Sequence, residues 1–232
     1  MANPHRATRP QPTMLIQPAL LALWGLVLLL SSLSGRLDLL LHRAFHGLVA
    51  SAGLALLTLA GLQLLQRRRL PRSLPPWPWL LSAAVAVAVL LIPPDPSFTV
   101  LASGRPDGLP EPPKLAFILP PEQRSLSEWV RLLRSRPDPA LYAGQAVRIS
   151  GFVLPQPEGP PLLARLQVRC CLADATPMGL AVAWPAGYQP QANQWLAMEG
   201  RMIMGQRGGE TISVVQPRRI QPIARPPRPL EP

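Results

Sequence analysis

The run MLIQPALLALWGLVLLLSSL, residues Met14–Leu33, contains no charged side chain over its twenty positions. A bilayer core about 30 Å thick needs roughly 20 helical residues, so this run is long enough to cross a membrane. It is also longer than the apolar core of a signal peptide, which has about 7–15 residues, and further apolar runs follow it. The sequence therefore predicts a membrane protein whose first helix is an uncleaved anchor.

Two more apolar stretches, Phe45–Leu65 and Trp77–Ile92, follow the first. The earlier one has the length of a span, and the later one reaches it when the flanking residues 75–93 are included. Trp77 and Trp79 suit the interfacial belt where a membrane helix meets water. We expect about three spans, near residues 14–33, 45–65 and 75–93, within a transmembrane region that covers residues 1–93.

Basic residues between these stretches indicate the orientation. Arg67, Arg68, Arg69 and Arg72 lie between the second and third stretches, and short loops rich in arginine stay in the cytoplasm. With three spans, the N-terminus is then cytoplasmic and everything after residue 93 is extracytoplasmic. We expect a multi-pass protein of the plasma or inner membrane, in contact with lipid.

Composition argues against two classes of function. Residues 1–93 carry eight of the 23 Lys and Arg residues and one of the 12 acidic residues, so much of the net charge of +11 serves membrane topology. No stretch interleaves clustered basic residues with aromatic ones, which argues against nucleic-acid binding. The chain lacks nucleophile-elbow, phosphate-loop and dinucleotide motifs, and no histidine follows residue 93. We therefore expect no enzyme.

The predicted extracytoplasmic part has three segments. Residues 94–121 are rich in proline and form a linker, residues 122–222 form the folded domain, and residues 223–232 form a disordered Pro/Arg tail. Ser125 and Glu128 have the spacing of a capping box, and Pro137 stops the short amphipathic helix that they begin.

Short strands separated by turn-rich segments make up the rest of the domain. Five of them, after one short helix, predict a small OB-like β-barrel; an open, sandwich-like sheet is the alternative. The predicted strands are Ala146–Leu154, Leu162–Cys171, Gly179–Trp184, Gln194–Arg201 and Thr211–Ile220.

Cys170 and Cys171 are the only cysteines of the chain, and Asp174 follows them. Adjacent Cα atoms lie about 3.8 Å apart, closer than in usual disulfides. In a regular strand the two thiols point to opposite faces, whereas a turn here brings a thiolate to the Asp174 carboxylate. Such a set suits zinc or copper(I). Alternatively, one cysteine is a core residue and Asp174 accepts hydrogen bonds from turn amides.

A second group of polar residues lies between the first two apolar stretches. Asp38, His42 and His46 are four residues apart, which on a helix places them along one stripe. A pair of histidines at this spacing can hold a metal, and ionisable groups at a span's mouth can mark an ion pathway. Alternatively, these residues have no specific function: Arg36 and Arg43 neutralise Asp38 at the membrane interface, and the histidines face lipid headgroups.

The block LQVRCCLADATPMGLAV, residues 166–182, resembles the DUF1980 family of bacterial membrane proteins, described as permease subunits. DPALYAGQAV at 138–147, Gly151 with the two residues after it, and Trp195 with Gly200 add to the resemblance. It implies an accessory subunit with a small external β domain, working with a separate polytopic permease. It also implies that Gly151, Trp195 and Gly200 have structural or partner-contact roles, and that His42 corresponds to a histidine after the family's first span.

Three hypotheses follow for the cysteine pair. In the first, Cys170, Cys171 and Asp174 bind a thiophilic metal for the permease, with His42 as a relay. In the second, the two thiols form a redox switch. In the third, the thiols are buried and the domain is a docking surface.

Overall fold

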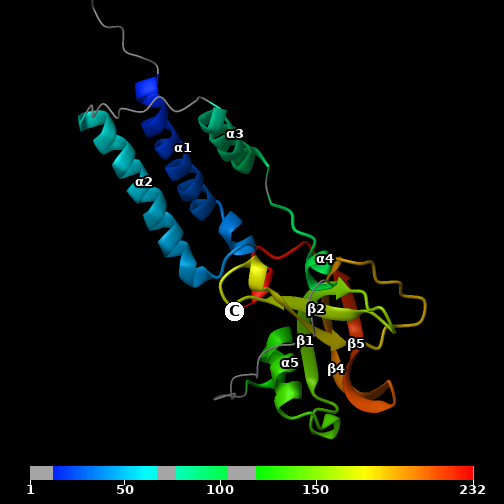
Figure 1. Cartoon of the computed structure of the whole chain (residues 1–232). Helices are drawn as coiled ribbons and strands as arrows, with labels where there is room; N and C mark the ends of the chain where they lie inside the picture. The colour runs from blue at the N-terminus through cyan, green and yellow to red at the C-terminus, as the bar shows by residue number, and fades with distance from the viewer. Residues whose placement is uncertain (1–12, 67–76, 93, 104–118, 232) are drawn as a thin grey trace, which may run out of the picture. The chain divides into compact units, whose positions relative to one another are not determined.

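The structure is a computed structural model that describes residues 13–66, 77–92, 94–103 and 119–231 (Figure 1). The arginines used to predict orientation, at 67–72, and most of the predicted linker lie outside these ranges. The chain divides into two compact units, which are described separately below. The first unit comprises Met1–Leu37 and Arg43–Pro94, and the second comprises Asp38–His42 and Asp95–Pro232.

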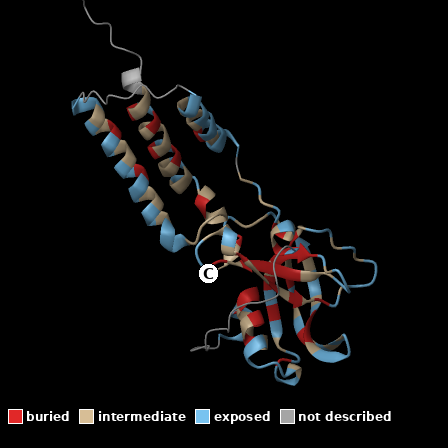
Figure 2. Ribbon diagram, in the orientation of Figure 1, coloured by how far each residue is buried: buried red, intermediate tan, exposed pale blue. Residues whose placement is uncertain are grey.

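The first unit is helical, with α1 at Thr13–Leu33, α2 at His46–Gln66 and α3 at Trp77–Leu91. Two of its helical segments, Ile16–Leu33 and Arg43–Gln66, are long and apolar enough to cross a membrane. The third helix has 15 residues, about 22 Å at 1.5 Å per residue, and is therefore shorter than the predicted span. Exposed large apolar side chains occur on α1, α2 and α3, and Figure 2 colours much of α2 and α3 as exposed.

Helices α1 and α2 meet at two glycines. A Cβ atom on Gly53 would lie 3.0 Å from the carbonyl oxygen of Gly25, and one on Gly25 would lie 2.9 Å from the Gly53 oxygen. The two backbones are thus in direct contact, as in membrane helix pairs that use small residues. Helix α3 is joined to α1 by a hydrogen bond of 3.0 Å that the Trp24 indole N–H donates to Ser82 Oγ.

We expect Gly53→Ala to loosen this helix pair, because the new methyl group must push two backbones apart. The expected cost is about 1–3 kcal/mol, the usual range for overpacking. Gly61→Ala on the same helix is the matched control, since nothing lies within 4 Å of its added Cβ. Heat denaturation of the purified protein, followed by circular dichroism, compares the two variants. Equal stability of both would show that α1 and α2 do not pack through Gly53.

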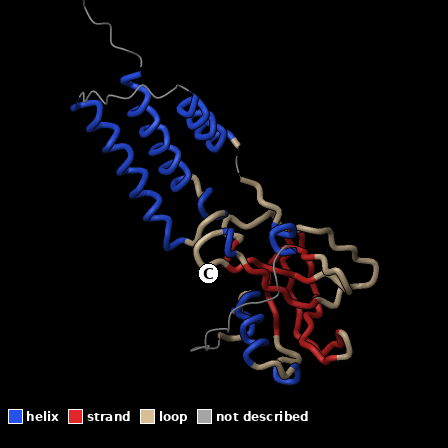
Figure 3. The backbone as a smooth tube through the Cα atoms, viewed as in Figure 1, coloured by secondary structure: helices blue, strands red, loops and turns tan. Residues whose placement is uncertain are grey.

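The second unit is built on an antiparallel sheet of order β3-β2-β1-β4-β5, with the short β6 paired in parallel to β2 (Figure 3). Helix α5, Leu126–Ser135, begins with the predicted capping box: Ser125 and Glu128 each accept the other's backbone amide. The strands are β1 Ala146–Leu154, β2 Leu162–Gln167, β3 Thr176–Ala181, β4 Trp195–Arg207, β5 Glu210–Pro222 and β6 Leu230–Glu231.

The sheet is not closed, so the prediction of an OB-like barrel is wrong and the open-sheet alternative is the better description. The edge strands β3 and β5 come together through one parallel bridge, Val182 to Val215, beside which the Ala183 amide donates to the Val215 carbonyl at 2.9 Å. Pro185 follows two residues later, and because proline has no N–H it cannot extend this ladder.

Two hydrophobic clusters cover the two sides of the sheet. The larger one includes Trp129 of α5 and strand residues such as Val153, Leu163 and Met202. The smaller one contains Phe98 of α4 (Phe98–Ser103), which packs against Phe152 and Trp195 with ring centroids 5.6 and 5.5 Å away. The predicted linker, residues 94–121, therefore contributes a helix to the domain core.

The C-terminal segment 223–231 also belongs to the fold, so the prediction of a disordered tail is wrong for these residues. Leu230 and Ile223 pack against the smaller cluster, and β6 pairs with the end of β2. The Val168 amide donates to the Glu231 carbonyl at 2.9 Å. Apolar contacts and backbone pairing therefore both join this segment to the sheet. We call residues 223–231 the C-terminal strap.

Candidate metal centre

The two cysteines lie in the connection between β2 and β3. This connection, residues 168–175, is called the Cys loop below. The predicted strand through Cys171 is wrong, because β2 ends at Gln167, whose partner in β3 is Thr176. Both ends of the loop are anchored, since Val168 and Ala175 are buried in the smaller hydrophobic cluster. The cysteines therefore lie on a loop whose ends are fixed by the core.

The Asp174 carboxylate shapes the loop by accepting three backbone amides. Oδ1 accepts from Arg169 at 2.9 Å, and Oδ2 accepts from Cys170 at 2.7 Å and from Cys171 at 3.4 Å. Asp174 itself lies at the end of a short 3-10 turn, Leu172–Asp174. The alternative role predicted for Asp174, acceptance of turn amides, is thus confirmed, and it is this role that brings the carboxylate beside the thiols.

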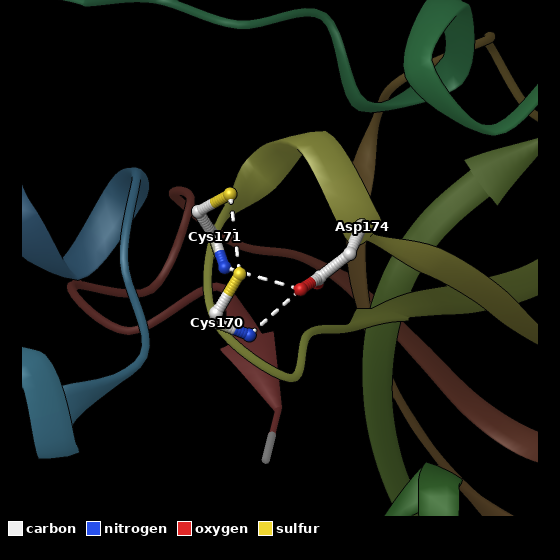
Figure 4. Close-up of side chains that lie close together, drawn as sticks. All are labelled: Cys170, Cys171 and Asp174. Carbon is white, nitrogen blue, oxygen red and sulfur yellow. Dashed lines mark hydrogen bonds between the residues drawn. The ribbon is translucent and has the colours of Figure 1, made fainter.

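The Cys170 thiol lies between the Cys171 thiol and the Asp174 carboxylate (Figure 4). The two sulfur atoms are 3.5 Å apart, and one ligand atom from each of Cys170, Cys171 and Asp174 lies within 4.8 Å of the others. Neither cysteine is a core residue, because Cys170 is exposed and Cys171 is half-buried. The separation of side chains expected for a regular strand does not apply here, since the loop turns at this point.

The electrostatics of the cluster follow from this crowding. Hydrogen bonds to Asp174 and to Cys171, with the nearby negative charge, raise the pKa of the Cys170 thiol to about 12. Burial opposes ionisation of Asp174, but the hydrogen bonds from the Cys170 thiol and the amides of Arg169, Cys170 and Cys171 outweigh it and lower the pKa of this carboxyl. At neutral pH the Cys170 thiol keeps its proton, and the carboxylate is ionised.

We expect Cys170 to react slowly with iodoacetamide at pH 7.5, because the thiolate is the reactive form. The rate should keep rising well above the ordinary thiol pKa. Asp174→Asn removes the negative charge that holds the proton, so the rate at pH 7.5 should increase several-fold. Mass spectrometry of the Cys loop peptide, with Cys171→Ser as the background, measures this rate. A pH profile that levels off near pH 9 in both proteins would contradict the prediction.

The residues predicted to form a helical stripe do not do so. Asp38 lies in the 3-10 turn Arg36–Leu39, His42 lies outside any helix or strand, and His46 begins α2. The chain is not helical here because Gly35 adopts a positive φ of 72° after α1, and because residues 40–42 pair with the Cys loop. His42 approaches the site through its backbone: its amide donates to the Cys170 carbonyl at 2.9 Å.

Other residues singled out in the sequence have clear positions in the sheet. A Cβ atom on Gly151 would lie 2.5 Å from the Ala164 carbonyl oxygen, and one on Gly200 would lie 2.1 Å from the Gln216 oxygen. Trp195 is buried in the smaller cluster. The sequence interpretation missed Arg165. It is the one charged residue inside the apolar run 162–166, and this position could have indicated a buried side chain with hydrogen-bond partners.

Comparison with known proteins gives one family. The profile of the DUF1980 C-terminal domain matches residues 123–230, which contain helix α5, the sheet and the Cys loop. Residues 123–230 are called the DUF1980 C-terminal domain after this match. No curated protein and no solved structure matches the chain.

The donor set of this DUF1980 C-terminal domain fits a soft or borderline cation. Two thiolates favour zinc or copper(I), and a carboxylate oxygen is compatible with zinc. Asp174 Oδ1 accepts one backbone amide, whereas Oδ2 accepts two. Oδ1 is therefore the oxygen with capacity for a metal. A bound cation would also favour the thiolate form of Cys170, and so oppose the effect of the Asp174 charge on the thiol pKa.

Proposed function

We propose that this chain is an accessory membrane subunit of a two-component permease, and that its DUF1980 C-terminal domain captures or senses a thiophilic metal ion. Cys170, Cys171 and Asp174 are the proposed ligands. One observation carries the proposal: three ligand atoms of the right chemistry lie within 4.8 Å of one another on an anchored loop. The cluster is half-exposed, so an ion can enter it from solvent.

The exposed surface of the helical unit supports the membrane assignment. Exposed large apolar residues lie along all three helices, whereas a water-soluble bundle buries such a surface. We propose that α3 also crosses the bilayer, with Trp77 at the interface. The arginines at 67–72 then place the N-terminus in the cytoplasm and the DUF1980 C-terminal domain outside. The partner of this assembly is a polytopic permease subunit.

The two cysteines provide a direct test of orientation, because the chain has no others. We expect a membrane-impermeant maleimide applied to intact cells to label the wild-type chain through Cys170 or Cys171. Reaction at alkaline pH compensates for the raised thiol pKa. The double variant Cys170→Ser, Cys171→Ser is the control for background. Labelling that appears only after the cells are broken would place the domain in the cytoplasm.

Metal content tests the binding proposal. The full-length protein is purified anaerobically beside the double Cys170→Ser, Cys171→Ser variant, and zinc, copper and free thiols are measured on the same samples. We expect close to one zinc or copper ion per wild-type chain and none in the variant. Equal metal content in both proteins, or no binding when zinc or copper(I) is added to the wild type, would contradict metal capture.

The close approach of the two sulfur atoms, 3.5 Å, supports a second candidate function. In a redox switch, an oxidant takes two electrons and two protons from the thiols, and the sulfurs join in a vicinal disulfide. The same samples separate the two functions. Metal-free wild-type protein with two thiols that are lost and recovered reversibly would favour the switch, and unreactive thiols would leave a docking domain.

A further inference from the structure

The short segment Leu40–His42 lies antiparallel to Cys170–Leu172 within the second unit. Two backbone hydrogen bonds join them: His42 donates to the Cys170 carbonyl at 2.9 Å, and Leu172 donates to the Leu40 carbonyl at 2.8 Å. Leu41 and Cys171 form the bridge between these bonds. The Cys loop is therefore held by a segment that is distant in sequence and belongs to the connection between α1 and α2.

The pattern of these bonds fixes which residues face each other. Because the bonds flank the bridge, Leu41 and Cys171 form a non-hydrogen-bonded antiparallel pair. Beyond this isolated bridge the next opposed residues are His42 and Cys170, whose backbones share the His42-to-Cys170 hydrogen bond. Side chains of directly opposed residues emerge on the same face, with Cβ atoms about 4.5–5.5 Å apart. The backbone of His42 therefore lies directly beside that of Cys170.

We propose that His42 is the fourth ligand of the metal centre, which then has two sulfur, one nitrogen and one oxygen donor. This inference rests on the proposed function and adds the residue that completes its site. Structural zinc sites hold four ligands in a tetrahedron, and the Cys loop supplies three. The His42 imidazole does not belong to the group of ligand atoms within 4.8 Å among the described residues. Rotation about its side-chain bonds brings it in when a metal binds.

This ligand connects two parts of the chain. His42 lies between the end of α1 and the start of α2 in the chain, whereas the other three ligands lie in the DUF1980 C-terminal domain. A metal that is bound by all four ties the connection between the helices to the Cys loop more firmly than two backbone bonds do.

His42→Ala tests this assignment, with His46→Ala as the matched control on the same connection. Full-length protein is titrated with zinc in competition with a chelator, and with cobalt(II), whose absorption reports the ligand geometry. We expect His42→Ala to keep one metal per chain, to bind zinc about 10–100-fold more weakly, and to lose the strong tetrahedral cobalt bands. His46→Ala should match the wild type.

His42→Cys tests whether a loss of affinity in His42→Ala is caused by misfolding, because it supplies another soft ligand from the same position. It should recover affinity and add intensity to the sulfur-to-cobalt charge-transfer band. If His42→Ala binds zinc and cobalt as the wild type does, while the double cysteine variant binds neither, the assignment of His42 is overturned and the metal site stands. If the wild type binds no metal, the proposed function fails first.

Discussion

Gly200→Ala is expected to unfold much of the β4–β5 half of the DUF1980 C-terminal domain. The added Cβ would lie 2.1 Å from the Gln216 carbonyl oxygen and 2.9 Å from Pro217 Cα, both of them backbone atoms. The pairing of β4 and β5 already changes register between Glu199 and Gly200, so the strands approach most closely where only glycine fits. A backbone cannot rotate away as a side chain can, and we expect a loss of about 3 kcal/mol or more.

Gly205→Ala in the same strand is the control for this prediction. Its Cβ would meet a methyl group of Val214 at 2.6 Å, which is a side chain and not backbone. Strand propensity changes equally in both variants, so the difference between them isolates the backbone collision. Hydrogen exchange of β4 and β5 peptides, read by mass spectrometry in the full-length protein, measures the effect. Equal exchange in the two variants would refute the argument for Gly200.

Local patterns were sufficient to predict some elements to the residue. The capping box of Ser125 and Glu128 begins α5 as the sequence indicated, because both partners lie within one helical turn. Strand β1 has the predicted bounds, since its alternating apolar residues are bounded by turns. Helices α1 and α2 were also predicted, because their apolar residues are contiguous in the sequence. These elements depend on interactions between residues that are close in sequence.

Elements that depend on distant partners were missed. Helix α4 forms within a proline-rich segment because Phe98 is buried against Phe152 and Trp195. Strand β2 ends before the cysteines because Asp174 takes the amides of residues 169–171, which are then no longer available to a ladder. Residues 40–42 are not helical because their backbone pairs with the Cys loop. Local periodicity contains no information about these partners.

The candidate site was predictable from the sequence only in part. Cys170, Cys171 and Asp174 could be grouped from the sequence alone, because they are close in sequence, the chain has only two cysteines, and a turn follows them. The stripe of Asp38, His42 and His46 assumed a helix, and without it the three residues occupy three different local structures. What the sequence did not contain was the register that places His42 opposite Cys170.

Arg165→Met is expected to release the C-terminal strap. The Arg165 guanidinium is buried, and it donates to the Ser150 carbonyl at 2.8 Å, to Ser150 Oγ at 2.8 Å, and to the Arg228 and Pro229 carbonyls at 3.4 and 3.3 Å. It also lies over the Trp195 ring, 4.9 Å from the centroid. Burial lowers the pKa of Arg165, and the Glu231 carboxylate opposes this shift.

Methionine keeps much of the volume of this side chain but none of its donors. The strap carbonyls then lose their partners, and Glu231, whose side chain is 18% exposed and 3.6 Å from Arg165, becomes an unpaired charge. Removal of one partner from a buried ion pair costs about 3–5 kcal/mol. Because β6 pairs with the end of β2 two residues before the cysteines, the strap should dissociate and the Cys loop should become more exposed to proteolysis.

A double-mutant cycle separates the effect of the unpaired Glu231 charge from that of the hydrogen bonds that Arg165 donates to the strap. If the unpaired carboxylate causes most of the loss, Glu231→Gln should restore stability to Arg165→Met, with a coupling energy of about 1–3 kcal/mol. If the strap carbonyls matter more, Glu231→Gln will leave Arg165→Met as unstable as before. Limited proteolysis at the strap, together with heat denaturation of the four proteins, gives both quantities. A strap that is cleaved no faster in Arg165→Met than in the wild type would show that the hydrophobic contacts of Leu230 hold it alone, and that Arg165 has another role.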